Sequence, residues 1–574
     1  MRLLKNPMVL FALFMLSYSA YRTFSEDLSY IIRSDGRGYY AYLPALIVFN
    51  DPSFEASAKA ENEYHEKKLA PLHLVKSHDG EVHNKYFPGV AVLQAPFFVI
   101  ATAVSWLANQ PIDGYSDIYS VFFYFGSIFY VILGLLFFYK VLKALFPKNH
   151  SSVLWIIPLF YFATPLFHYS VHTPSFGHLY SFFLFTWFSW TVIKLKEYRS
   201  GKRFLILGLI LGLIVIVRPT NVFIVSAIPL LLGDYKTVKN LFRSLNLNYL
   251  LQLFIGFFST LALLFLVWKW ESGNWIVWSY SGEGFNFLNP KLIDTLFSFR
   301  IGLLIHTPIV LLAIFSGIIL FRKNSFQASF WTIYFIINTW IIASWWCWDY
   351  ESPFGNRPFT EHLFFLLLPL FTLLIKKNKL IVGLSVVFTL IGILRLWSYS
   401  SGHMPNQRFT SSNYITSLAV WNDDNYNRWN YTRSCRPYGE RIQENVLLND
   451  TPQTIVEPNQ EFICSVIAPL AKPRTNERFY YRVELEKRIS QKSLSGVFLV
   501  IDAINKSNGQ RYYHATELMN DRQEGKGNWA KLLFEGTLHD SFQEYDNVKI
   551  YIWNPERQTF SVRRVKITLD VYKS

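Results

Sequence analysis

Long runs of apolar residues recur along this chain of 574 residues, and they restrict its fold more than any other feature. Many of these runs approach twenty residues, which is the length that an α-helix needs to cross the hydrocarbon core of a bilayer. A soluble domain does not contain so many stretches of this kind. The sequence therefore predicts an α-helical polytopic membrane protein.

The apolar runs predict eleven membrane spans. The first follows a charged start and resembles a signal peptide, but many spans follow it, so we expect a retained helix. The run at 88–107 is expected to be re-entrant or interfacial, because another full crossing would turn the later basic loops outward. The predicted spans lie near residues 8–24, 118–139, 152–169, 176–194, 203–217, 220–233, 250–268, 301–320, 328–346, 360–375 and 380–397.

The formal net charge of +15 has two possible meanings, nucleic-acid binding or membrane topology. Its distribution favours topology and no nucleic acid, because the basic residues cluster in short loops between predicted spans, as the positive-inside rule describes for cytoplasmic loops. Eleven spans from a cytoplasmic N-terminus then place the C-terminus outside. The clusters are Lys140, Lys143 and Lys148; Lys194, Lys196, Arg199, Lys202 and Arg203; Lys236, Lys239 and Arg243; Arg322 and Lys323; and Lys376, Lys377 and Lys379.

The chain changes character near its end. Apolar and polar residues alternate at 481–485, 548–553 and 565–571, and turn residues such as those at 507–509 separate such stretches. Alternation with period two predicts antiparallel strands, arranged as a small β-sandwich. We expect residues 1–400 to form the membrane-embedded domain, 401–450 a connector and 451–574 the sandwich. Of the three cysteines, Cys435 and Cys464 either form a disulfide there or remain two free thiols.

Asp35 is the strongest candidate for chemistry. It follows the first predicted span, between Arg33 and Arg37 and ahead of the pair Tyr39 and Tyr40. A carboxylate at the edge of a membrane protein is suited to act as a general base on a hydroxyl group. The alternative is that Asp35 caps a local turn, as aspartate before glycine often does.

Arginine residues on the same predicted side are suited to hold a phosphate, because a guanidinium group donates two parallel hydrogen bonds and stays charged. Arg218 lies beside Pro219 at a predicted helix break, where a charge is either used or extends to the surface. Arg300 precedes a span. Arg357 ends the loop 345–357, in which Asp349 or Glu351 is an alternative partner for it.

Other polar residues on this side are weaker candidates for substrate binding. Glu283 lies between two glycines and is suited to bind a sugar hydroxyl or a metal ion. The histidines near 168–178 lack the spacing of a zinc site, so a substrate-lining role is favoured. For Lys85, extension of the side chain to the surface is the alternative to a phosphate contact. The predicted substrate-binding residues are Arg37, Lys85, His172, His178, Arg218, Glu283, Arg300, Asp349 and Arg357.

The order of these segments resembles a known family. An outer-loop aspartate after the first span is followed by Lys-Tyr-Phe-Pro-Gly at 85–89, Arg-Pro-Thr at 218–220, Gly-Glu-Gly-Phe at 282–285 and Phe-Gly-Asn-Arg at 354–357. Over residues 1–400, this order is similar to the bacterial GT-C superfamily of integral membrane glycosyltransferases, in the group related to mannosyl- and aminoarabinose-transferring enzymes.

The resemblance implies a polyprenyl-phosphate sugar as donor, a lipid or glycan acceptor, an active site on the outer face of the bacterial inner membrane, and Asp35 as catalytic base. Many members carry two acidic residues in the first outer loop, whereas here Glu26, Asp27 and Asp51 are not adjacent to Asp35, which leaves the need for a divalent metal ion open. Sandwich domains appended to some such enzymes suggest carbohydrate contact for 451–574.

Three other classes compete with a transferase. A flippase for lipid-linked glycans would also be polytopic, but it is expected to have related halves, and the sequence has no such repeat. An O-antigen-type polymerase would use a lipid-linked glycan as both donor and acceptor. A non-enzymatic anchor that presents a carbohydrate-binding sandwich would lose its function when residues 451–574 are deleted, whereas a transferase would retain its core activity.

Overall fold

The protein comprises two compact units. The helical unit contains Met1–Ser281, His306–Ile342 and Arg357–Ile393, and the sandwich unit contains Gly282–Ile305, Ala343–Asn356 and Leu394–Ser574. The computed structural model describes residues 7–25, 28, 31–64, 74–76, 82–280, 283–350, 354–400, 440–470, 477–488, 497–504, 511–517, 529–537, 546–555, 557 and 559–573.

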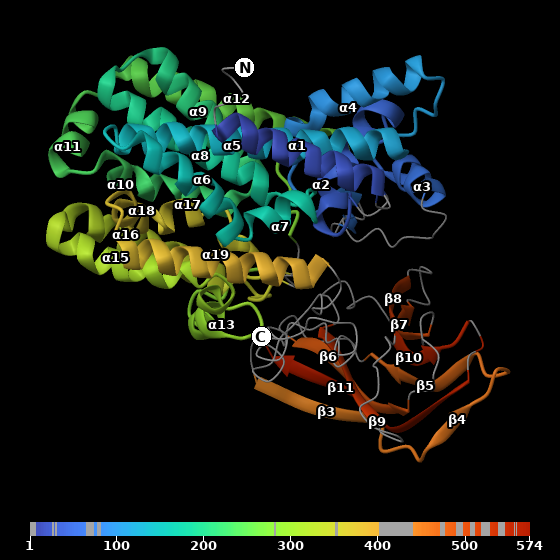
Figure 1. Ribbon diagram of the computed structural model, residues 1–574. Coiled ribbons are helices and arrows are strands. Elements are labelled where there is room, and N and C mark those ends of the chain that lie inside the picture. Colours follow the sequence, from blue (N-terminus) through green and yellow to red (C-terminus); the bar gives the residue numbers. More distant parts are fainter. Residues whose placement is uncertain are drawn as a thin grey trace. The chain divides into compact units, whose positions relative to one another are not determined.

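Helices of very different length pack together in the helical unit (Figure 1). Its first half contains α1 (Pro7–Ser25), α2 (Asp35–Leu43), α3 (Glu55–Tyr64), α4 (Gly89–Leu107), α5 (Asp117–Leu145), α6 (His150–Ala163), α7 (Leu166–Val171), α8 (His178–Glu197) and α9 (Gly201–Val217). Its second half contains α10 (Ile228–Leu232), α11 (Tyr235–Arg243), α12 (Leu247–Ser272), α15 (Ile309–Lys323), α16 (Ser325–Ser344), α17 (Leu363–Leu366), α18 (Leu368–Ile375) and α19 (Lys379–Ser400).

Short segments connect these helices. A two-stranded sheet of β1 (Leu74–Lys76) and β2 (Val82–Asn84) precedes α4. Tighter or wider helical turns form η3 (Pro44–Phe49), η4 (Pro219–Ala227) and η5 (Arg357–Phe359). Proline is the first residue of η3 and η4 and the second residue of η5. Because proline lacks an amide hydrogen and has a fixed φ, an α-helix tends to end before it.

Among the described residues, five helices are long and apolar enough to cross a membrane, namely α4, α5, α12, α16 and α19. A sixth crossing results if Pro219–Leu232 and Tyr235–Arg243, which are bent by 120° at the break between them, count as one span. The eleven spans predicted from the sequence are therefore not shown, whereas the prediction of an apolar, helical membrane protein agrees with these helices.

Proline accounts for much of this difference. The predicted span 152–169 is split into α6 and α7 around Pro165, and the predicted span 301–320 is split into α14 (Leu303–His306) and α15 around Pro308. The run at 88–107 forms one continuous helix, α4, of 19 residues with Pro96 inside it, and this helix is long and apolar enough to cross a membrane. A re-entrant loop is therefore not what the structure shows, whereas an interfacial position stays a prediction. Hydropathy locates apolar sequence, but it does not detect where a helix breaks.

Small residues let α9 and α12 approach closely. Gly208 and Gly212, spaced as G-x-x-x-G, both face α12, and a Cβ at Gly208 would overlap the carbonyl oxygen of Leu253. Gly256 of α12 faces Leu205 of α9 in the same way. Close backbone packing of this kind holds helices together where lipid removes the hydrophobic drive.

Two antiparallel sheets form the sandwich, which confirms the predicted C-terminal sheets. Ile550, Ile552, Ile567 and Leu569 belong to a core of buried side chains that both sheets share. One sheet has the order β5-β10-β7-β8 and the other β3-β11-β6-β9, with β4 beside β11. The strands are β3 (Glu440–Leu448), β4 (Thr454–Val456), β5 (Phe462–Pro469), β6 (Glu477–Arg488), β7 (Phe498–Ile504), β8 (Arg511–Glu517), β9 (Trp529–Thr537), β10 (Asn547–Trp553) and β11 (Phe560–Lys573).

Two details of the C-terminal prediction change. The first strand of the sandwich, β3, begins at Glu440, inside the range 401–450 that was expected to be a connector. Residues 401–439 lie outside the described residues. The turn predicted at 507–509 lies outside the described residues too, between the antiparallel neighbours β7 and β8. Cys464 has a free thiol, so it does not form the disulfide with Cys435 that the sequence left open.

Candidate functional site

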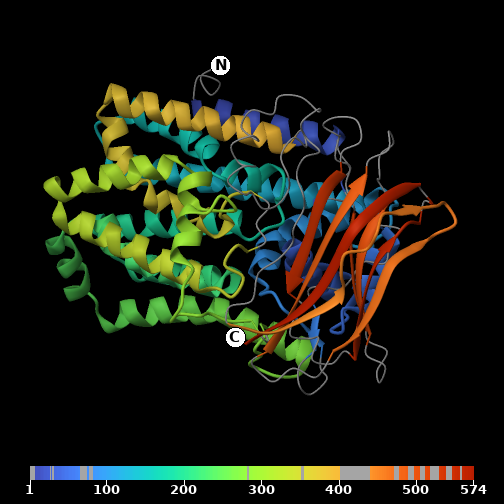
Figure 2. The ribbon, with the colours of Figure 1, turned by 90° about the horizontal axis from the view of Figure 1, so that it is seen from below.

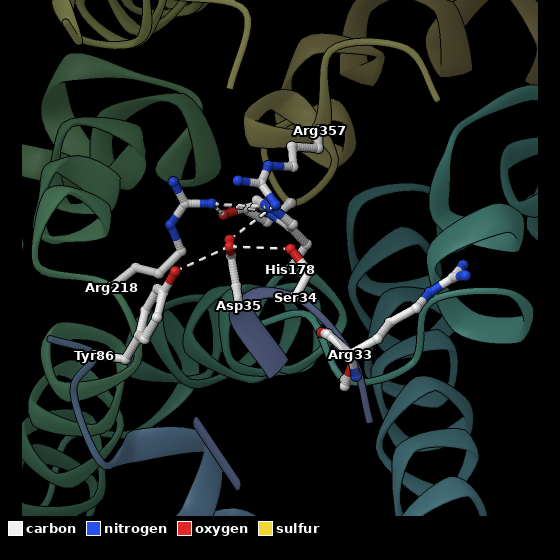
Figure 3. Close-up of polar contacts among 9 residues, drawn as sticks. Arg33, Ser34, Asp35, Tyr86, His178, Arg218 and Arg357 are labelled. Atoms are coloured by element: carbon white, nitrogen blue, oxygen red, sulfur yellow. Dashed lines mark hydrogen bonds and ion pairs between the residues drawn. The ribbon is translucent and has the colours of Figure 1, made fainter. Parts of the chain in front are cut away.

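Asp35 is the first residue of α2, and its carboxylate turns away from the helix backbone. Ser34, at the N-cap, has a φ of 52° and makes no side-chain cap. One carboxylate oxygen of Asp35 lies 2.8 Å from Nη1 of Arg357, and the other accepts a hydrogen bond of 3.0 Å from the hydroxyl of Tyr86. The side chain of Asp35 is 22% exposed. The carboxylate of Asp35 therefore forms an ion pair, and it also accepts a hydrogen bond of 3.5 Å from the hydroxyl of the neighbouring Ser34 (Figure 3). The local role that the sequence offered as an alternative stays a prediction.

The start of α2 is held against the turn before α8. A Cβ at Gly36 would overlap the side chain of Ser175, so only glycine fits there without a shift. Ser175 donates a hydrogen bond of 3.3 Å from Oγ to the carbonyl oxygen of Arg33. The guanidinium group of Arg33 donates to the carbonyl oxygen of His172 at 2.9 Å, and in Figure 3 it points away from Asp35.

Arg357 determines the electrostatics of Asp35. Burial alone would raise the pKa of Asp35, but the charges of Arg357 and Lys85 and the hydrogen bond from Tyr86 bring it below its usual value. Burial likewise opposes the charged form of Arg357, and Asp35 more than compensates, so the pKa of Arg357 is raised. The guanidinium group of Arg357 also stacks 4.8 Å from the ring centre of Phe176. Asp35 is thus ionised at neutral pH.

A second acidic group lies beside this pair. Glu361, fully buried, lies 2.8 Å from Nδ1 of His178 and accepts hydrogen bonds from Arg218 at 3.4 Å and Asn221 at 3.1 Å. Nη1 of Arg218 is 2.8 Å from Nδ1 of His178. In Figure 3 the side chains of Arg218, His178 and Arg357 converge near Asp35.

Tyr39 connects the two halves of this cluster. The charges of Asp35, Arg218, Arg357 and Glu361 all act on its hydroxyl, and burial together with Asp35 raises the pKa of Tyr39. We use the name Asp35 cluster for Asp35, Tyr39, Tyr86, His178, Arg218, Arg357 and Glu361.

Lys85 lies at the edge of this cluster. Its ammonium group is 5.7 Å from the ring centre of Tyr86 and 5.4 Å from that of Tyr280. Asn84 fixes this segment, since its side chain donates to the carbonyl oxygen of Gly38 in α2 at 2.7 Å. The strand β2 thereby brings Lys85 and Tyr86 next to the start of α2.

The remaining predicted substrate-binding residues have other surroundings. Arg37 makes a two-point ion pair with the buried Glu61, at 2.6 and 2.8 Å. His172 follows α7 as its C-cap, and its ring stacks on His168 with 5.5 Å between the ring centres.

Glu283, Arg300 and Asp349 belong to the sandwich unit, where Arg300 and Asp349 form an ion pair. The sequence offered Asp349 or Glu351 as a partner for Arg357, but Arg357 pairs with Asp35 instead. The substrate-binding roles of Glu283, Arg300 and Asp349 remain predictions.

The sequence did not single out Tyr86, Asn221 or Glu361. A signal existed for Glu361, because a carboxylate at the start of an apolar run at 360–375 is costly unless it is paired. Tyr86 lies inside the segment 85–89 that was noted for its lysine, and Asn221 directly follows the segment 218–220 that was noted for its arginine. Nothing in those patterns distinguishes these two residues.

The residues of the Asp35 cluster do not fit a divalent metal ion. The oxygens of Asp35 are occupied by Arg357 and Tyr86, and those of Glu361 by His178, Arg218 and Asn221. Nearby guanidinium groups would repel a cation. Within the described part of the chain, no group of three or more His, Cys, Asp or Glu side chains is arranged to hold a metal ion.

This chain has little similarity to known proteins. No family model matches the chain, and no curated protein matches it. One similar solved structure is the cryo-EM structure of arabinosyltransferase EmbB from Mycobacterium smegmatis, with 9% sequence identity and a TM-score of 0.30. The similarity covers 96% of this chain and 64% of that one. A likeness of this size does not establish a common fold.

Proposed function

We propose that this protein is a membrane glycosyltransferase, which moves a sugar from a polyprenyl-phosphate donor to a hydroxyl group of a lipid or glycan acceptor. The observation that supports it is the Asp35 cluster: a partly exposed, ionised carboxylate lies with two guanidinium groups in one unit of apolar helices. A carboxylate can remove the proton of an acceptor hydroxyl as a general base, and guanidinium groups can bind a departing phosphate.

In the proposed reaction, a carboxylate oxygen of Asp35 removes the proton of the acceptor hydroxyl. The acceptor oxygen attacks the anomeric carbon, and the bond from that carbon to the phosphate oxygen breaks, with its electron pair leaving on the phosphate. Arg218, Arg357 and Lys85 stabilise the added negative charge. One displacement without a covalent intermediate inverts the anomeric configuration, as in inverting hydrolysis.

The arrangement of α8 and α9 supports a site on the outer face. Both helices have one end at the Asp35 cluster, at His178 and next to Arg218, and the other end at the basic loop 198–200. A helix of 20 residues spans about 30 Å, close to the hydrocarbon thickness of a bilayer. If the basic loops are cytoplasmic, as the positive-inside rule predicts, the cluster is extracytoplasmic.

Asp35→Asn tests the proposal. Membranes that contain the variant are supplied with polyprenyl-phosphate hexoses and pentoses and with a total lipid extract as acceptor, and labelled product is measured. We expect a loss of transfer of about 10²- to 10⁴-fold, because the acceptor proton has no base. Asp234→Asn, which changes a carboxylate near the basic loops, is the matched control and should transfer normally. Near-normal transfer by a folded Asp35→Asn protein would reject the proposal.

A further inference from the structure

The end of the helical unit opposite the Asp35 cluster gathers its basic loops into one surface. Lys140 of α5 and Lys194 of α8 both lie over the ring of Trp190, at 6.0 and 4.5 Å. Arg203 of α9 donates to the carbonyl oxygen of Lys194 at 2.6 Å. These contacts bring the ends of α5, α8 and α9 together.

Further contacts extend this surface to α11 and the turn between α15 and α16. The charge of Asp234, the N-cap of α11, acts on Lys196 of α8. The side chain of Asn324 donates to the carbonyl oxygen of Gly233 at 2.8 Å. Figures 1 and 2 both show α11 and the α15–α16 turn at the same end of the helical unit. Four of the five basic clusters thus share one face.

Helix α11 is amphipathic in an unusual way. Leu241 is buried, but Tyr235 and Phe242 are 62% and 60% exposed, and they lie among the exposed basic residues Lys236, Lys239 and Arg243. The chain turns by 120° between Pro219–Leu232 and this helix, so α11 does not continue the direction of the preceding apolar segment. Exposed aromatic rings among cations are typical of a helix that lies in the headgroup region of a bilayer.

Next to α11, two lysines lie side by side. The positive charge of Lys376, which follows α18, acts on Lys323 at the end of α15, and this repulsion lowers the pKa of Lys323. Among the described residues, no carboxylate lies within ion-pair distance of Lys236, Lys239, Arg243, Lys323 or Lys376. An anion between such cations would remove the repulsion.

We propose that α11 and the α15–α16 turn form a binding surface for the headgroups of acidic phospholipids in the leaflet that faces the basic loops. The cations would bind the phosphates, and Tyr235 and Phe242 would enter the boundary with the acyl chains. The aromatic pair favours a lipid over a soluble phosphate, because a soluble ion offers these rings nothing to bury against. This inference is independent of the reaction proposed for the Asp35 cluster.

Lipid retention by the full-length protein tests the inference. The protein is purified in a neutral detergent, given phosphatidylglycerol or phosphatidylcholine with the same acyl chains, and analysed by native mass spectrometry. We expect preferential retention of phosphatidylglycerol. The variant K236Q/K239Q/R243Q should reduce that preference by roughly tenfold, because each basic residue near an anionic lipid surface contributes to binding. K59Q/R557Q/R564Q removes three exposed charges elsewhere and should retain the lipid.

Two further arms separate the sources of an anion and protect against misfolding. The variant Y235S/F242S keeps every charge and should also retain less phosphatidylglycerol than the wild type. An excess of soluble glycerol phosphate should leave lipid binding largely intact. The inference is overturned by equal retention of the two lipids, by wild-type retention in K236Q/K239Q/R243Q, by unchanged retention in Y235S/F242S, or by complete displacement with glycerol phosphate.

Discussion

At the level of single residues, the ion pair of Asp35 and Arg357 explains how the proposed base stays ionised while its basicity is lowered. Arg357 lowers the pKa of Asp35, which keeps the carboxylate ionised and makes it a weaker base. An anionic donor that binds Arg357 would offset part of that effect. We therefore infer that donor binding raises the basicity of Asp35, so that the base gains strength when a substrate is present.

Replacing Arg357 should change the pH dependence of transfer. In the wild type, the lowered pKa of Asp35 keeps the acid limb of kcat/KM below the ordinary aspartate value of about 3.9. In Arg357→Gln the charge that most lowers this pKa is lost while burial still raises it, so the limb should move to higher pH. Arg37→Gln, which affects the pair with Glu61, is the control. An unmoved limb in Arg357→Gln would contradict this account.

The buried Glu361 should matter for stability. Glu361→Leu leaves Arg218 and His178 without their buried carboxylate, and breaking a buried pair in this way costs about 3 kcal/mol. Thermal unfolding in detergent should show a clear fall in Tm. Glu444→Leu removes the exposed pair with Arg441 and should change stability by less than about 1 kcal/mol. Equal effects of the two substitutions would show that the Glu361 network is not stabilising.

At the level of elements, close packing positions the cluster. Helix α2 reaches the turn before α8 only because Gly36 has no side chain at Ser175, and α9, which ends next to Arg218, approaches α12 at Gly208 and Gly212. In each case a close approach between neighbouring segments fixes the position of a charged residue, which is Asp35 in the first case and Arg218 in the second. Substitutions far from the chemistry should therefore affect it.

Gly36→Ala should displace the start of α2. The added methyl group overlaps Ser175, and overpacking of this kind costs about 1–3 kcal/mol. We expect a lower Tm and reduced transfer, and partial recovery of both in Gly36→Ala/Ser175→Gly. Gly383→Ala, at a helical position with open space around it, should be neutral or slightly stabilising. If the second substitution restores neither stability nor transfer, overlap with Ser175 is not the cause.

At the level of the whole molecule, the sequence predicted the features that a regular pattern of apolar residues indicates, namely strands and apolar helices. Alternation at 548–553 and 565–571 predicted β10 and β11, and the apolar runs predicted a helical membrane protein. Periodicity did not predict breaks such as the one at Pro308, because two short helices and one span have the same apolar content. It also missed that Arg357 pairs with Asp35, more than 300 residues away, since a tertiary contact leaves no local pattern.

The two ends of α8 and α9 give a topological prediction for the whole protein. The Asp35 cluster and the basic surface lie at opposite ends of these helices, so a membrane-impermeant reagent should reach them from opposite sides. In a Cys464→Ser background, Lys59→Cys, on α3 near the cluster, should react with a maleimide polymer in right-side-out vesicles. Lys236→Cys, on α11, should react only in inverted vesicles. Both replaced lysines are exposed, and the background protein gives the signal of the remaining cysteines. If both new cysteines react from the same side, the basic loops and the proposed active site face one compartment. If Lys59→Cys reacts only in inverted vesicles, the proposed active site faces the cytoplasm, and a donor and acceptor on the outer face are ruled out, whatever the chemistry of Asp35.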